Sequence, residues 1–188
     1  MDTSRVSRTD VERYGRWYSQ IRAVIVKRFG ADADLFIDLL AALSPRSQVR
    51  RNWRMAVMVY TKWKRGLRVI DCLMGVMKSH QPNVQRALTR QPLSGQKVQR
   101  FAENLKRDTD AVTVDVWICR AFDADFLHLT AAKYAEIEAA IRRQATELGV
   151  RTHELQAAIW QVQRQTDGRK PVSFLCAIED ERQMSFWG

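Results

Sequence analysis

Apolar residues recur at intervals of three and four positions along almost the whole chain of 188 residues, which is the spacing of amphipathic helices. The pattern contains no internal repeat and no linker, so we predict an all-α protein that folds as a single compact unit over residues 1–188. No apolar run approaches the roughly 18 residues that a membrane span needs. The spacing predicts helices over 10–29, 31–43, 67–77, 94–106, 130–148 and 152–165, and a helix that begins at Ser44 and Pro45. Pro82 opens a short segment that ends at Arg90.

Several details of these helices follow from individual residues. Thr152 is a predicted N-cap, Thr130 is a predicted helix start, and Gly149 is a predicted helix end. The helix after Pro45 is expected to turn Val49, Trp53, Ala56, Val57 and Tyr60 inward. In the helix over 94–106, the inward stripe is Val98, Phe101, Ala102 and Leu105, whereas Lys97, Arg100, Asn104 and Arg107 form a polar row on another face.

Two segments leave the type of structure open. Residues 112–122 begin with β-branched side chains, which favour a strand, but Val114, Trp117, Ile118 and Ala121 also fit a helix capped by Thr113. Residues 166–188 show no helical period, so an irregular tail is expected there. Within that tail, residues 172–178 would be a short strand or an extended segment.

The positive charge of the chain is unevenly distributed. The net charge is +10, but residues 1–107 contain 22 Lys and Arg against 8 Asp and Glu, and residues 108–188 contain 9 against 13. Such an excess on one part of a surface predicts contact with phosphate groups. The simplest alternative is a solvated helical face, and anionic lipid or an acidic protein are other partners of basic domains.

The chain lacks the motifs of several familiar enzyme classes. No glycine-rich phosphate loop, HExxH or GxSxG motif occurs. The three histidines are scattered and Cys72, Cys119 and Cys176 are far apart, so we predict free thiols and neither a metal site nor an organic cofactor. The first ten residues form no apolar signal region, and a cytoplasmic location is therefore expected.

A motif in the middle of the chain resembles the helix-hairpin-helix DNA glycosylases of the endonuclease III type. The matching stretches are Leu93-Ser94-Gly95-Gln96-Lys97-Val98 and Val114-Asp115-Val116-Trp117-Ile118-Cys119-Arg120, with Lys97 and Asp115 separated by 18 positions as in that family. The earlier stretch Leu43-Ser44-Pro45-Arg46-Ser47 resembles the loop that enters the duplex beside the target base. The resemblance therefore implies a helix-hairpin-helix glycosylase-like fold and a partner that is double-stranded DNA with a modified base.

The resemblance also implies roles for particular residues. Asp115 would be the catalytic carboxylate, ionised at a helix start, and it would stabilise an oxocarbenium-like sugar. Lys97 would be a second catalytic residue that attacks the sugar as a neutral amine and gives strand cleavage as well. Arg46 would be inserted near the vacated base. The residues expected to contact DNA are Ser44, Arg46, Ser47, Arg50, Arg51, Arg54, Ser94, Gly95, Arg100 and Arg120.

The sequence departs from the family pattern at several points. Leu93 replaces the first glycine of the hairpin, which would alter the approach of the backbone to phosphate, and Val116-Trp117 replace a Thr-His pair. The C-terminal four-cysteine cluster is also missing. A further resemblance is to short phage-borne members of the superfamily, related to the alpha-glutamyl/putrescinyl thymine pyrophosphorylases. That branch implies a bacterial or phage-infected host cell.

Three functions remain open at this point. The first is a DNA glycosylase, with or without lyase activity, that acts on a flipped-out base and needs no obligate protein partner. The second is a phage enzyme that transfers a group onto a modified thymine or uracil without cutting the glycosidic bond. The third is a non-catalytic DNA-binding protein. In that case Asp115 would be an ordinary helix-start acid, Lys97 a solvated or phosphate-contacting lysine, and Arg120 the partner of a carboxylate.

Overall fold

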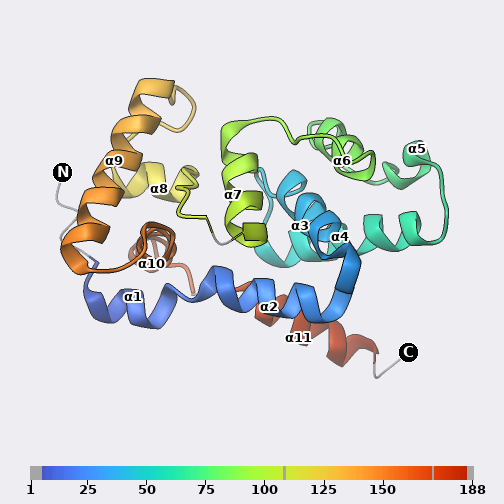
Figure 1. Ribbon diagram of the computed structural model, residues 1–188, viewed down its shortest axis with the longest axis horizontal. Helices are drawn as coiled ribbons and strands as arrows, with labels where there is room; N and C mark the ends of the chain where they lie inside the picture. Colours follow the sequence, from blue (N-terminus) through green and yellow to red (C-terminus); the bar gives the residue numbers. More distant parts are fainter. Residues whose placement is uncertain (1–5, 108, 171, 186–188) are drawn as a thin grey trace. The chain divides into compact units, whose positions relative to one another are not determined.

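The computed structural model describes residues 6–107, 109–170 and 172–185, and in these ranges all regular structure is helical (Figure 1). The all-α prediction is therefore confirmed. Within the described part of the chain, no helix has the length and apolar character needed to cross a bilayer. The helices are α1 Arg8–Tyr14, α2 Trp17–Phe29, α3 Ala33–Ala42, α4 Val49–Lys64, α5 Val69–Cys72, α6 Gln81–Leu88, α7 Gln96–Arg107, α8 Val116–Ala121, α9 Ala131–Leu148, α10 Thr152–Thr166 and α11 Phe174–Ser185, with a short 3-10 turn at Gly30–Asp32.

The chain divides into two compact units, where the sequence suggested one. Unit 1 consists of Met1–Gln20 and Glu103–Pro171, and unit 2 consists of Ile21–Ala102 and Val172–Gly188. Two of the boundaries fall inside α2 and α7, so neither is marked by a glycine-rich or proline-rich linker. A division of this kind leaves no compositional signal, which is why the sequence did not show it.

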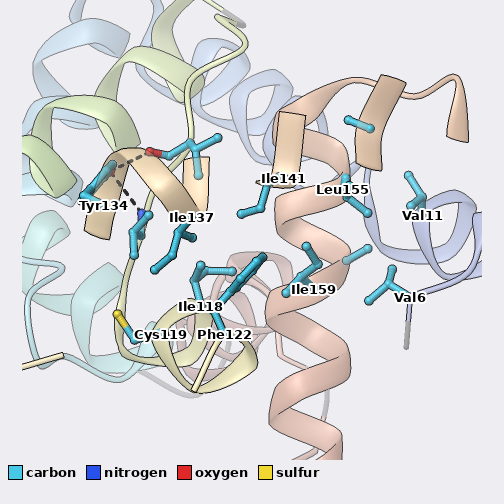
Figure 2. Packing of buried hydrophobic residues seen from close by; sticks show 14 residues of the cluster. Val6, Val11, Ile118, Cys119, Phe122, Tyr134, Ile137, Ile141, Leu155 and Ile159 are labelled. Carbon is cyan, nitrogen blue, oxygen red and sulfur yellow. Dashed lines mark hydrogen bonds between the residues drawn. The ribbon is translucent and has the colours of Figure 1, made fainter. Parts of the chain in front are cut away.

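The core of unit 1 is built around α10. This helix packs against α1, α8 and α9, and Figure 2 shows Leu155 and Ile159 of α10 among the side chains of the other three. Every one of these helices contributes an apolar stripe at helical spacing, such as Ile137 and Ile141 of α9. The fully or largely buried members of this core are Val6, Val11, Val112, Val114, Ile118, Cys119, Phe122, Tyr134, Ile137, Ile141, Ala145, Leu155, Ala158 and Ile159.

The core of unit 2 surrounds α3, a helix that is apolar on nearly every side and is therefore buried on nearly every side. It packs against α4 and α6. Phe36 of α3 stacks on Phe29 with ring centroids 3.8 Å apart and meets Trp53 of α4 edge-on at 5.0 Å. The ring centroid of Trp53 also lies 6.1 Å from that of Phe174 in α11, a helix that packs on α4.

Two helices, α7 and α9, agree closely with their predicted ranges. The range of α7 differs from the predicted helix by two residues at its start, and Val98, Phe101, Ala102 and Leu105 are buried as expected. Thr130 caps α9 by accepting a hydrogen bond from the Lys133 N–H at 3.1 Å, and Gly149 ends that helix with φ +64°.

Several other predictions of helix boundaries are wrong, each for a local reason. The predicted helix over 10–29 is divided into α1 and α2 at Gly15, a weak helix former that is the C-cap of α1. The predicted helix over 67–77 is reduced to α5, because Gly75 adopts φ +85° and ends the segment. The N-cap of α10 is Arg151, since the Thr152 hydroxyl instead donates to Asp110 at 2.7 Å.

The two ambiguous segments are both resolved as helices. In residues 112–122 the helix α8 starts at Val116, and its cap is Asp115, not Thr113. The predicted irregular tail at 166–188 is wrong over residues 174–185, where α11 forms. Its buried residues Phe174, Ala177 and Ile178 do have helical spacing, but the surface that they cover belongs to α4, more than a hundred positions earlier in the chain.

A buried tyrosine of unit 1 should make the protein less stable as the pH rises in the alkaline range. Tyr18 is 3% exposed, and its hydroxyl donates a 3.0 Å hydrogen bond to Oε1 of Gln156. Burial raises the pKa of Tyr18 from 10.0 to about 12. Between these values the unfolded chain loses a proton that the folded chain keeps, so stability falls as pH rises. We expect the free energy of unfolding to drop by about 2–3 kcal/mol from pH 10 to 12. Urea titrations of native protein and Tyr18→Phe check this, because the variant should lose less stability over that interval.

Candidate functional site

The whole net charge of the protein belongs to unit 2. Unit 1 contains 14 Lys and Arg and 14 Asp and Glu, whereas unit 2 has an excess of ten positive charges. Within unit 2 the excess comes from Ile21–Ala102, which contains 16 Lys and Arg against 4 Asp and Glu. A concentration of this kind creates a field that attracts a polyanion.

The segment between α3 and α4 is a tight turn, where the sequence predicted the start of a helix at Ser44 and Pro45. The Ser47 N–H donates to the Ser44 carbonyl at 3.2 Å, and Arg46 has φ +54°. With Pro45 before it, Arg46 occupies the position of a type II turn that favours glycine. The Ser44 hydroxyl is buried and finds no partner in the described part of the chain, so it neither caps α4 nor faces solvent. The turn thus exposes Arg46 at the expense of backbone strain.

This strain leads to a prediction about stability and binding. Replacement of Arg46 by glycine should raise the free energy of unfolding by about 0.5–1 kcal/mol, because relief of the left-handed conformation outweighs the added freedom of the unfolded chain. The same variant should bind duplex DNA more weakly if Arg46 contacts it. Urea unfolding and a filter-binding titration measure the two effects. A loss of stability in Arg46→Gly would contradict the proposed strain.

The first turns of α4 present a row of cations beside this turn. Arg50, Arg51 and Arg54 are all exposed, while Trp53 and Ala56 of the same helix are buried, as the sequence predicted. Of the other residues predicted to face inward, Val49, Val57 and Tyr60 are only half-buried. The first turn of α4 contains no acidic residue and no side-chain cap. The positive end of the helix dipole therefore adds to the arginine charges.

A short loop that contains Ser94 and Gly95, here called the hairpin, joins α6 to α7. Asn83 of α6 fixes Ser94 by a pair of hydrogen bonds, one to the Ser94 carbonyl at 2.9 Å and one from the Ser94 N–H at 2.7 Å. The side-chain amide of Gln99 donates to the Leu93 carbonyl at 2.7 Å, and Gly95 adopts φ +92°. The Leu93 side chain is buried in unit 2 and anchors the loop in the core.

The first turn of α6 connects the hairpin with the turn that contains Arg46. His80, at the start of α6, donates from Nε2 to the Pro45 carbonyl oxygen at 2.8 Å. Three positions later, Asn83 holds Ser94. Two of the predicted DNA-contacting segments, 44–47 and 94–95, are therefore attached to one helical turn. Sequence reasoning missed both His80 and Asn83, because neither partner is close in the sequence.

The remaining predicted residues of α7 are only partly accessible. Lys97 and Arg100 are half-buried in unit 2. The prediction that Asn104 lies in an exposed polar row is wrong. Its side chain is 1% exposed and forms hydrogen bonds with the backbone of Ala111. Lys97 belongs to unit 2 and Asp115 to unit 1.

Asp115 is the N-cap of α8, and both of its carboxylate oxygens accept hydrogen bonds. Oδ1 accepts from the Trp117 N–H at 2.9 Å and the Ile118 N–H at 3.1 Å. Oδ2 accepts from the indole Nε1–H of Trp160 at 2.9 Å. The position of Asp115 at a helix start is thus as predicted. Trp160 was not found from the sequence, since it lies beside Ile159 and off the apolar stripe of α10.

Cations and indole rings alternate next to Asp115. The Arg164 guanidinium carbon lies 5.1 Å from the ring centroid of Trp117 and 4.7 Å from that of Trp160, and the Arg120 guanidinium carbon lies 4.7 Å from Trp117. Burial lowers the pKa of Arg164, and the charge of Arg169 lowers it further. Arg120 forms an ion pair with Asp167 at 2.7 Å. The sequence left two roles open for Arg120, a DNA contact and the pairing with a carboxylate, and this ion pair is the second.

The comparisons with known proteins give a family and nothing more. A family model described as a family of unknown function (DUF7178) matches residues 4–167. No curated protein matches the chain, and no solved structure does so either. Among the described residues, no group of three His, Cys, Asp or Glu side chains could hold a metal ion.

Proposed function

The chain belongs to the DUF7178 family, and we propose that it is an enzyme that binds double-stranded DNA through unit 2 and acts on a flipped-out base. The simplest activity is that of a DNA glycosylase for a modified pyrimidine, with Asp115 as the catalytic carboxylate and Lys97 as a candidate nucleophile. We place this activity in the cytoplasm of a bacterial or phage-infected cell, where DNA is accessible.

One observation carries the proposal. Unit 2 holds the entire positive excess of the protein, and within it the Arg46 turn and the Ser94-Gly95 hairpin are fixed to the same first turn of α6. Two rigid backbone segments with cations around them suit a duplex, in which phosphates recur at fixed spacing. A disordered basic tail would provide the charge without this fixed geometry.

The chemistry would follow from the surroundings of Asp115. Extrusion of a base costs a few kcal/mol, which phosphate contacts of unit 2 would offset. Three N–H donors hold the carboxylate in place, and a fixed negative charge there would stabilise the oxocarbenium-like sugar as the glycosidic bond breaks. Lys97, as a neutral amine, would attack C1′, displace the base and form a Schiff base that permits strand cleavage.

A panel of duplex oligonucleotides with different pyrimidine modifications tests the proposal. Mass spectrometry of the products should show a free base and an abasic site. An intact but altered nucleoside would instead identify a base-modifying transferase on the same scaffold. Borohydride should trap a covalent adduct with native protein and not with Lys97→Gln if the lysine is the nucleophile.

A second candidate is a DNA-binding protein without catalysis. It is favoured by the hydrogen bonds of Asp115, which are those of an ordinary helix cap. Tight duplex binding with unchanged nucleosides for every substrate of the panel would establish this second function. Weak binding to duplex DNA even at low salt would contradict both.

A further inference from the structure

The backbone that leads into Asp115 is buried but belongs to neither a helix nor a strand. Ala111, Val112, Thr113 and Val114 are each at most 5% exposed. Buried peptide groups need hydrogen-bond partners, and regular secondary structure provides none for this segment. Two side chains of unit 1 supply partners for four of these groups, and neither side chain has a role in the proposed chemistry.

Asn104 of α7 clamps the start of the segment. Its Nδ2 donates to the Ala111 carbonyl at 2.7 Å, and its Oδ1 accepts from the Ala111 N–H at 3.1 Å. The same oxygen accepts from the Thr109 hydroxyl at 3.1 Å. One side-chain amide thus provides hydrogen-bond partners for both the N–H and the C=O of Ala111, as a neighbouring strand would.

Tyr134 of α9 fixes the end of the segment, immediately before Asp115. Its hydroxyl donates to the Val112 carbonyl at 2.7 Å and accepts from the Val114 N–H at 3.2 Å. Figure 2 shows both interactions at the edge of the unit 1 core. Tyr134 is 5% exposed, so no water can easily replace its hydroxyl.

We propose that Asn104 and Tyr134 are positioning residues that hold the Asp115 carboxylate in the position that the reaction requires. The inference rests on the proposed function of Asp115. The carboxylate is fixed on one side by α8 and Trp160, and on the other by the clamped segment. Reacting groups misplaced by about 1 Å lose on the order of a hundredfold in rate, so a side chain that sets this backbone controls the reaction without touching the substrate.

The experiment compares Tyr134→Phe with Ile137→Val. Both residues lie in α9 and face the same core, and both changes should lower the melting temperature by a few degrees. Only Tyr134→Phe should lower kcat for base release, by about 10- to 100-fold, while the Kd for duplex DNA stays within twofold of the native value. Asn104→Leu, which also removes the clamp, should behave like Tyr134→Phe. Equal kcat values in Tyr134→Phe and Ile137→Val would overturn the proposal.

A second measurement keeps this inference separate from the proposed function. The Trp160 indole N–H resonance and the hydrogen exchange of the Trp117 and Ile118 amides report directly on the Asp115 carboxylate. These signals should change in Tyr134→Phe and remain native in Ile137→Val. If native protein releases no base from any substrate, the enzymatic function fails while these signals still decide the positioning role. If they are unchanged in Tyr134→Phe, the positioning role fails by itself.

Discussion

Asp115→Asn should abolish base release and leave the protein folded and bound to DNA. Asparagine is as good an N-cap as aspartate, so α8 should still form. Its amide NH2 cannot accept from the Trp160 indole N–H, so the melting temperature should fall by a few degrees. The variant loses the negative charge that would stabilise the sugar cation, and we expect a rate loss on the order of 10³-fold. Affinity for duplex DNA should be unchanged or higher, because one repulsion with the phosphates is removed.

The control for this experiment is a second acid at a helix start in the same unit. Asp110 accepts hydrogen bonds from the Thr152 hydroxyl at 2.7 Å and from the His153 N–H at 3.1 Å, at the beginning of α10. Asp110→Asn should cost some stability and leave the rate of base release native. Product formation by Asp115→Asn at the native rate would show that the carboxylate is a helix cap only, and would favour the non-catalytic DNA-binding protein.

The parts of the fold that the sequence predicted well are those whose signals are local. For α9, an N-cap, an apolar stripe and a terminal glycine occur within 20 positions, and α7 has an equally regular stripe. The helix over 174–185 was not predicted, because its apolar face is stabilised by distant residues. Phe174 packs near Trp53 of α4, and this contact cannot be seen in the local sequence. Helical propensity of short segments is a weak signal, and tertiary packing decides their structure.

In the candidate site, too, the sequence predicted local contacts and missed long-range ones. Asp115 could be placed at a helix start because its capping partners are two and three positions away. The bond from Trp160 spans 45 positions and that between His80 and Pro45 spans 35, and no pattern in the sequence links such pairs. The effect of Leu93 on the approach of the backbone to phosphate stays a prediction. The structure shows that its side chain is buried and that Asn83 and Gln99 bond to the loop around it, which the sequence did not indicate.

Neutralisation of the first turns of α4 should cause the largest loss of DNA affinity. In the triple variant Arg50→Gln, Arg51→Gln and Arg54→Gln, up to three phosphate contacts disappear while the buried face with Trp53 stays native. Each contact contributes roughly 0.9 to the slope of log K against log salt. The slope should therefore become shallower by about three, and affinity at 0.1 M salt should fall by two orders of magnitude or more, to about the same extent for every DNA sequence.

The matched control removes three arginines from unit 1, which has no excess of charge. Arg13, Arg142 and Arg143 are exposed, and their replacement by glutamine changes the net charge of the protein by the same amount. The surface pair of Arg142 with Glu138 is lost, at a cost of less than about 1 kcal/mol. Titrations of labelled duplex at several salt concentrations separate the two cases. If both triple variants lose the same affinity, binding follows net charge alone, and the rigid turn and hairpin of unit 2 do not form the DNA interface.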